Sequence, residues 1–232
     1  MSETLKIDDL TIEIRRSPRR RTVDLVVDRF GDLVINVPEA LNEAQVIGIV
    51  RRKQEWIYTK LQQKESILKP GNAKEYVTGE GFYYLGKKYR LKLVADKADA
   101  PLRLLNGRFV MSRQAAKQGR DHFISWYTRR GKEWIRGAVE LLRERVAVTP
   151  RSVVVRDLGY RWASCNTQKT VYFHWRVTLM PPNIIRYLVL HELVHLHEPN
   201  HSPAFYRRLA RACPEHKTLE HWLEVNGDRF DI

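Results

Sequence analysis

The segment at residues 184–196 constrains the fold more than any other part of the chain, because its apolar residues lie on nearly every side of a helix. A helix of this kind must be buried inside a domain. It nevertheless carries two histidines and a carboxylate, namely His191, His195 and Glu192. Burying such groups costs several kcal/mol unless something satisfies them, and a bound metal ion would do so.

The spacing of these three residues fits a single ion. His191 and His195 form an HExxH pattern, with Glu192 directly after the first histidine. Residues four apart share one face of a helix, so both imidazoles can converge on one zinc ion. The adjacent Glu192 can then take a proton from a zinc-bound water. The pattern therefore predicts a centre that holds one Zn²⁺, with Glu192 as the general base.

A catalytic zinc ion takes three protein ligands and keeps one position open. His201, ten residues after His191, is the best third ligand. The segment Pro199-Asn-His-Ser-Pro203 can end one helix, present His201 and begin the next helix. Its first proline disfavours helical backbone at the preceding residue, and its Ser-Pro pair suits a helix start.

Other side chains offer alternative ligands in place of His201. They are two carboxylates and two thiols, on Glu198, Glu215, Cys165 and Cys213. Free buried cysteines are common in proteins, which favours a packing role for both thiols. His197 falls off the ligand face of the helix, and we expect it to be exposed or hydrogen-bonded.

The remaining periodicity places strands first and helices later, which favours an α+β fold. Alternation with period two predicts a small antiparallel meander over residues 8–37 and hairpins over 82–94 and 102–111. Residues 153–155 and 170–173 are predicted to form paired strands. Helical periodicity and stop signals predict helices over residues 41–68, 115–146, 182–197, 203–212 and 218–225.

The charge of the chain points to an anionic partner. Lys and Arg number 41 against 27 Asp and Glu, a formal charge of +14. This field suits a nucleic acid, a nucleotide or an acidic protein surface. The basic clusters at residues 15–16, 19–21, 51–53 and 207–208 are scattered along the chain, so contact with nucleic acid through a basic surface stays a candidate only.

Three absences in the sequence lead us to expect a cytoplasmic protein with no membrane partner. The chain has no apolar run of about 18 residues that would span a membrane. Its N-terminus lacks a basic region followed by an apolar stretch, so no signal peptide is expected. Two cysteines are too few for a disulfide framework.

Several motifs occur together with the HExxH segment. They are Arg161-Trp-Ala-Ser-Cys165, Trp175-Arg176, Pro181-Pro182 and Asn200-His-Ser-Pro-Ala-Phe205. In this combination the chain resembles the YgjP-like metallopeptidase-fold family, which is related to SprT and WLM domains. One departure is Ala163, where family members commonly have glycine.

The resemblance implies a zincin-like metalloprotease fold, in which an antiparallel sheet packs on the HExxH helix behind an N-terminal β-rich extension. We expect an N-terminal β-rich region with one long helix over residues 1–112 and a zincin-like catalytic domain over 113–232, in one compact unit. The zinc ligands map onto His191, His195 and His201, and the general base maps onto Glu192.

The expected function is a zinc-dependent hydrolase of the metallopeptidase type, with a peptide substrate. One alternative is a nucleoside triphosphate pyrophosphohydrolase that uses the same metal site on a nucleotide substrate. Another is a DNA-associated protease or binding module. Arg161 and Arg176 are candidates to hold a substrate carboxylate or phosphate, and Tyr206 is a candidate to reach an oxyanion.

Overall fold

The computed structural model describes residues 3–8, 10–27, 33–67, 74–95, 100–159 and 161–232. These residues form a mixed α/β architecture with three sheets and six α-helices. The chain consists of two compact units, Met1–Gly71 and Asn72–Ile232. The division falls after Gly71 and not at the predicted residue 112, because the strands between 81 and 112 share a core with the long helix that follows them.

The first unit contains a four-stranded sheet in the order β1-β2-β4-β3. Its strands are β1 (Glu3–Ile7), β2 (Leu10–Ser17), β3 (Asp24–Val27) and β4 (Leu33–Pro38). β2 and β4 run parallel, so the predicted antiparallel meander is wrong at this pair. The register sets Ile14 beside Ile35, and both are fully buried, so the parallel pair joins two strongly apolar strands at the centre of the sheet. Residues 28–32 of the predicted meander, between β3 and β4, lie outside the described residues.

Two helices, α1 (Glu43–Arg52) and α2 (Gln54–Ile67), take the place of the single helix predicted over residues 41–68. Asn42 begins α1 with a capping box: its side chain accepts from the backbone N–H of Gln45 at 2.9 Å, and the Gln45 side chain accepts in return at 3.0 Å. Lys53 separates the helices, with φ −104° and ψ 8°. The last predicted residue of that helix, 68, lies outside the described part of the chain.

The second unit begins with a four-stranded sheet in the order β5-β6-β8-β7. Its strands are β5 (Gly81–Tyr84), β6 (Lys87–Val94), β7 (Leu102–Leu105) and β8 (Arg108–Ser112). Both predicted hairpins are confirmed, and β6 and β8 join them as a parallel pair. Asn106 and Gly107 have φ of 46° and 72°, the positive values that a tight hairpin turn requires.

A long helix and a second sheet follow. A 3₁₀ turn (Ala115–Gln118) leads into α3 (Gly119–Val146), within the range predicted as one helix. The second sheet contains β9 (Ser152–Arg156), β10 (Ala163–Cys165) and β11 (Thr170–His174), in the order β10-β11-β9. β9 and β11 run parallel, because the chain crosses over to place β10 on the outer side of β11. The sheet is therefore mixed and not antiparallel as predicted.

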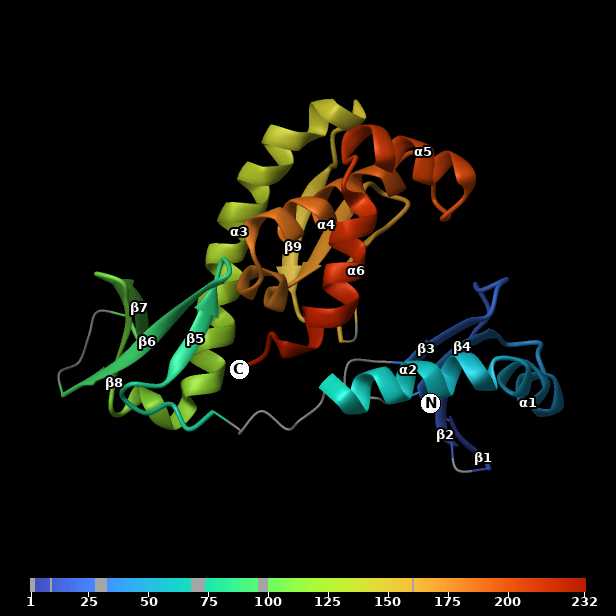
Figure 1. The fold of residues 1–232 in the computed structure, drawn as a ribbon, viewed down its shortest axis with the longest axis horizontal. Coiled ribbons are helices and arrows are strands. Elements are labelled where there is room, and N and C mark those ends of the chain that lie inside the picture. The colour runs from blue at the N-terminus through green and yellow to red at the C-terminus, as the bar shows by residue number, and fades with distance from the viewer. Residues whose placement is uncertain (1–2, 9, 28–32, 68–73, 96–99, 160) are drawn as a thin grey trace. The chain divides into compact units, whose positions relative to one another are not determined.

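The predicted C-terminal helices are confirmed with small shifts at their ends. After the 3₁₀ segment η2 (Trp175–Leu179) come α4 (Pro182–His195), α5 (Pro203–Ala212), α6 (His216–Asn226) and a short 3₁₀ turn, η3 (Gly227–Arg229). α4 packs against α3 and against β10, and Figure 1 shows α3 running along the whole length of this unit. No described helix combines the length and apolarity needed to cross a membrane.

Gly86 connects β5 to β6 and joins this hairpin to the segment before α4. The backbone N–H groups of Leu85 and Gly86 donate to the carbonyls of Thr178 and Leu179 at 2.8 and 3.1 Å. Gly86 has φ of +76°, and a Cβ there would lie 2.9 Å from the Cα of Pro181. We expect Gly86→Ala to lower the free energy of unfolding by about 1–2 kcal/mol for the backbone conformation and by a further 1–3 kcal/mol, roughly, for the overlap.

Gly107→Ala is the matched control for this measurement by urea denaturation. Gly107 also has positive φ, +72°, but nothing lies within 4 Å of the added Cβ. The Gly107→Ala variant should therefore lose only the part of the unfolding free energy that comes from the backbone conformation. Equal losses in the two variants would show that the contact with Pro181 does not matter.

Candidate metal centre

Three imidazoles meet at one place in the second unit. His191 and His195 lie one turn apart on α4, and His201 lies in the connection between α4 and α5. The Nε2 atoms are 3.1 Å apart for His191 and His195, 3.2 Å for His195 and His201, and 3.1 Å for His191 and His201. The structure thus brings together the three residues that the sequence predicted as ligands.

This triangle of nitrogens has the size that a zinc ion requires. Zn–N bonds of about 2.0–2.1 Å at tetrahedral angles place ligand nitrogens roughly 3.3 Å apart. Among the described residues, no other group of three His, Cys, Asp or Glu side chains is arranged to hold a metal ion. The donor set, three imidazoles, suits zinc and the other late transition metals.

The hydrogen bond of His195 shows which of its nitrogens is free to bind. Its Nδ1 lies 3.0 Å from the carbonyl oxygen of Glu198. A carbonyl only accepts, so Nδ1 carries the proton and donates, and the neutral ring presents its lone pair at Nε2. Burial, reinforced by the neighbouring imidazoles, lowers the pKa of His191 to about 3, and burial also lowers the pKa of His195. Neutral imidazole is the form that binds a metal.

Phe205 forms the apolar floor on which the three imidazoles pack. It is fully buried, and its ring centroid lies 5.0, 4.4 and 4.8 Å from those of His191, His195 and His201. Its backbone N–H donates to the hydroxyl of Ser202 at 3.3 Å, which confirms the predicted N-cap of α5. The sequence analysis missed the packing role of Phe205, although the predicted helix start placed it in the first turn.

Glu192 is a buried carboxylate directly beside the imidazole cluster. Its side chain is only 4% exposed, and its Oε2 has no hydrogen-bond partner among the described residues. Burial raises the pKa of Glu192 to about 8, although the positive charge of Arg161 acts in the opposite direction. A buried, unsatisfied carboxylate oxygen needs a partner that the described residues do not provide.

A pocket of about 360 Å³ opens beside this carboxylate. Residues from three parts of the second unit line it: the segment 161–163, which leads into β10, and side chains of α4 and α6. The lining residues from the two helices are Tyr187, Leu188, His191, Glu192, Glu220, Leu223 and Glu224. The two carboxylates from α6 were not singled out from the sequence, because nothing local connects α6 to the HExxH helix.

The three residues predicted to contact a substrate lie in different places. Arg161 lines the pocket. Tyr206 is 41% exposed, and its ring centroid lies 6.1 Å from that of His201. Arg176 is not among the lining residues: it is 3% exposed and forms an ion pair with Asp231 near the C-terminus. The prediction that Arg176 holds a substrate therefore has no support in the geometry.

None of the alternative ligand side chains is part of the imidazole cluster. The Glu198 carboxylate binds Arg208 at 3.2 Å. Glu215 lines a separate pocket together with Cys213, and both cysteines are free thiols. His197 is hydrogen-bonded through its Nε2 to the carbonyl of Val146 at 3.0 Å, as the sequence analysis expected.

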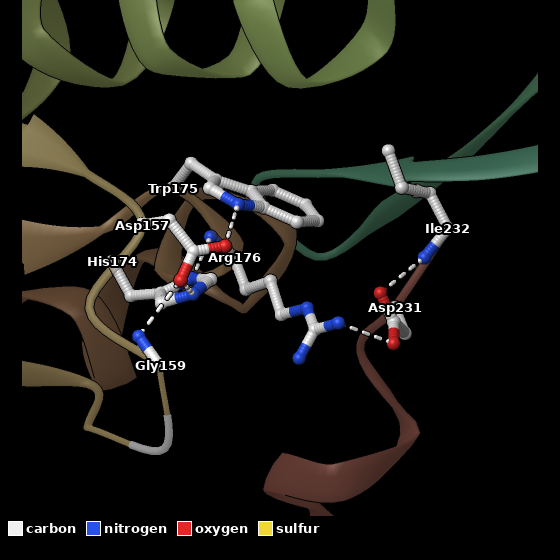
Figure 2. Close-up of polar contacts among 7 residues, drawn as sticks. All are labelled: Asp157, Gly159, His174, Trp175, Arg176, Asp231 and Ile232. Carbon is white, nitrogen blue, oxygen red and sulfur yellow. Dashed lines mark hydrogen bonds and ion pairs between the residues drawn. The ribbon is translucent and has the colours of Figure 1, made fainter. Parts of the chain in front are cut away.

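Arg176 belongs to a polar corner at the junction of β11 and η2, shown in Figure 2. The Nδ1 of His174 accepts from the backbone N–H of Arg176 at 3.1 Å, so in the neutral ring the Nε2–H donates to Asp157, 3.2 Å away. The Asp157 carboxylate also accepts from the backbone N–H of Gly159 at 2.7 Å and from Trp175 Nε1 at 3.4 Å. These contacts hold the C-terminal end of β11 in place. β11 pairs with β10, and Ala163 of β10 lines the pocket.

Asp157 should make the stability of this corner depend on pH. Burial alone would raise the pKa of Asp157, but its hydrogen bonds with Gly159, His174 and Trp175 lower it below the ordinary 3.8. A carboxylate with a lowered pKa stabilises the fold above its ordinary pKa, and loses that contribution as the pH falls through the folded-state value. Because the Asp157 side chain is 62% exposed, solvent screens these contacts, and we expect Asp157→Asn to cost only about 0.5–1 kcal/mol at neutral pH. The difference from wild type should shrink below pH 3.8.

Urea denaturation at a series of pH values measures this difference. Glu13→Gln is the control, because Glu13 forms an exposed pair with Arg15 and its removal should change stability by less than about 1 kcal/mol. A cost of Asp157→Asn that stays constant as the pH is lowered would contradict the assignment.

A family model and a solved structure are similar to this chain. Residues 21–226 match the family model described as "YgjP-like, metallopeptidase domain". The crystal structure of the metallopeptidase zymogen abylysin of Pyrococcus abyssi is similar with a TM-score of 0.35 and 22% identity, over 38% of this chain and 89% of that chain. No curated protein matches the chain. Because the family match spans most of its length, the chain belongs to the YgjP-like metallopeptidase family.

Proposed function

We propose that this protein is a zinc-dependent metallopeptidase, in which His191, His195 and His201 hold the ion and Glu192 is the general base. The observation that carries the proposal is the triangle of Nε2 atoms, 3.1–3.2 Å on each side, next to a buried carboxylate. Membership of the metallopeptidase family supports a hydrolase. The packing of α4 against β10 supports a zincin-like arrangement of the catalytic unit.

Each residue of the cluster has a distinct task in this proposal. A zinc ion held by the three imidazoles would supply a Lewis acid and would lower the pKa of the attacking water toward about 7. Glu192 accepts the proton of the attacking water and passes it to the leaving amine. Its burial keeps bulk water away from the carboxylate and raises its affinity for that proton. Tyr206, exposed next to His201, is our candidate donor to the developing oxyanion.

The open edge of β10 offers a place for a peptide backbone. β10 is the outer strand of its sheet and pairs with β11 alone. The carbonyl of Trp162 accepts from His174, and the N–H of Asn166 donates to Thr170, so the backbone groups of Ala163 between these residues face away from β11. Ala163 also lines the pocket. An extended peptide can therefore add to this edge as a further strand and reach the metal centre.

The charges around the pocket favour a peptide over a nucleoside triphosphate. Glu220 and Glu224 line it together with Glu192, and Arg161 is the one basic residue among the lining side chains. A triphosphate carries several negative charges, which these carboxylates would repel. Arg161 is instead suited to a single carboxylate of a peptide substrate.

Metal content tests the ligand assignment directly. We expect about one zinc ion per chain in the purified protein, and a loss of most of it in His201→Ala, because a site with two imidazoles binds zinc far more weakly. His197→Ala is the control, since His197 binds the carbonyl of Val146 and not the cluster. Elemental analysis of the three proteins gives the result, and full zinc content in His201→Ala would exclude His201 as a ligand.

Glu192→Gln separates catalysis from metal binding. The amide keeps the shape of the side chain but cannot act as a base, so we expect peptide hydrolysis to fall by about 10²–10⁴-fold while the zinc content is unchanged. Cleavage of a labelled protein and of a mixed peptide library gives the rate. Retention of full activity by the variant would disprove the role of Glu192, and release of pyrophosphate from nucleotides without peptide cleavage would replace the peptidase by the nucleotide hydrolase.

A further inference from the structure

The β5–β8 sheet of the second unit has one covered face and one open face. Alternation along β6 places Tyr89, Leu91 and Leu93 on the covered face. Leu91 is 1% exposed, and Phe109 of the neighbouring strand packs edge-on against Phe123 of α3 at 5.0 Å. In Figure 1 the first half of α3 lies along this side of the sheet.

The open face carries a dense set of positive charges. The residues of β6 that alternate with the covered ones are Lys88, Arg90 and Lys92, and all three are exposed. The register of β6 and β8 sets Arg90 directly beside Arg108, which is also exposed. Arg103 lies on the same face of β7, opposite Val110. The four strands contain no Asp or Glu at any position.

Four of the cations on this face have no carboxylate partner among the described residues. Like charges on neighbouring strands repel one another and destabilise a sheet. Within the described residues, no carboxylate pairs with Lys88, Arg90, Lys92 or Arg108, whereas arginines of α3 and α5 do have such partners. The second unit also carries most of the excess positive charge of the chain. Repulsion of this kind is relieved by an external polyanion.

We propose that this open sheet face binds the phosphate backbone of a single-stranded nucleic acid. Alternate residues on a strand are about 6.6 Å apart and neighbouring strands about 4.8 Å apart, so the side chains form a grid of cations that a line of phosphates can follow. Tyr83 of β5 is 36% exposed on the same face. Its ring packs edge-on against Phe230 at 5.3 Å, and the ammonium of Lys88 lies 5.8 Å from its ring centroid, so part of the ring stays open to a ligand. An aromatic ring among cations on a flat sheet is the arrangement that receives an unstacked base.

The shape of the face distinguishes this partner from two others. A duplex groove accepts a protruding helix or ribbon, and this surface is a sheet face without either. A membrane surface requires several large apolar anchors beside the cations. On this face Leu105, 44% exposed and opposite Arg108, is the one large aliphatic side chain, and Gly81, Val110 and Ser112 take the other outward positions near Arg90. The inference does not depend on the proposed peptidase activity, because the residues lie outside the metal centre.

The test measures the affinity of the full chain for a fluorescein-labelled 25-nucleotide oligothymidine. Fluorescence anisotropy gives the binding constant K at each of several salt concentrations. Each lost phosphate contact should reduce the slope of log K against log salt by about 0.7 for a single strand. Arg90→Gln combined with Arg108→Gln should therefore reduce the slope by about 1.4, which is roughly a 20-fold weaker affinity at 0.1 M salt.

Arg129→Gln combined with Arg136→Gln is the matched control, because it removes the same charge from exposed positions of α3. It should change affinity by less than about threefold. Lys88→Gln combined with Lys92→Gln provides a second pair on the open face, and thermal melting verifies that each variant is folded. The proposal is overturned if wild type does not bind the oligomer at low salt, or if the control weakens binding as much as the open-face pairs. Displacement of the oligomer by an equal concentration of duplex DNA or of anionic vesicles would also overturn it.

Discussion

The burial of α4 is the constraint on which the rest of the second unit depends. The helix is apolar on almost all sides, and helices and strands surround it, yet it carries Glu192 at 4% exposure and the partly buried His191. Both polar residues lie on the one side of α4 that borders the pocket. On that side Phe205 packs against the His191 imidazole, and residues 161–163 and helix α6 line the pocket. The pocket therefore gives the polar side chains of α4, His191 and Glu192, access to solvent or to a ligand.

Much of the fold could be predicted because its signals are local. The Asn106–Gly107 turn, the Ser202 cap and the stop signals around Pro199 each act within a few residues, and the structure agrees with them. The predicted pairing of residues 153–155 with 170–173 is confirmed as β9 with β11. The parallel direction of this pair, and the pairs β2–β4 and β6–β8, could not be predicted in this way. β2 with β4, β6 with β8, and β9 with β11 join strands through crossovers, and alternation along one strand says nothing about which neighbour it takes or in which direction.

The metal centre was predictable for the same reason, and its substrate contacts were not. The three imidazoles lie within eleven residues of sequence, so spacing and turn chemistry were sufficient to group them. Arg161 and Arg176 look alike in sequence, each next to a tryptophan. Only tertiary packing separates them, since Arg161 lines the pocket and Arg176 pairs with Asp231. The carboxylates of α6 reach the pocket through packing alone.

The short stretch of chain that supplies all three imidazoles has a consequence for how zinc acts on stability. Ligands so close together in sequence can also gather around an ion in the unfolded chain, where closing such a small loop costs little entropy. Zinc that binds both states shifts the folding equilibrium by less than its affinity for the native site alone would give. If the proposed zinc site is correct, the midpoint of thermal unfolding would be a poor measure of zinc occupancy. A local site of this kind would then matter more for the reaction than for the stability of the fold.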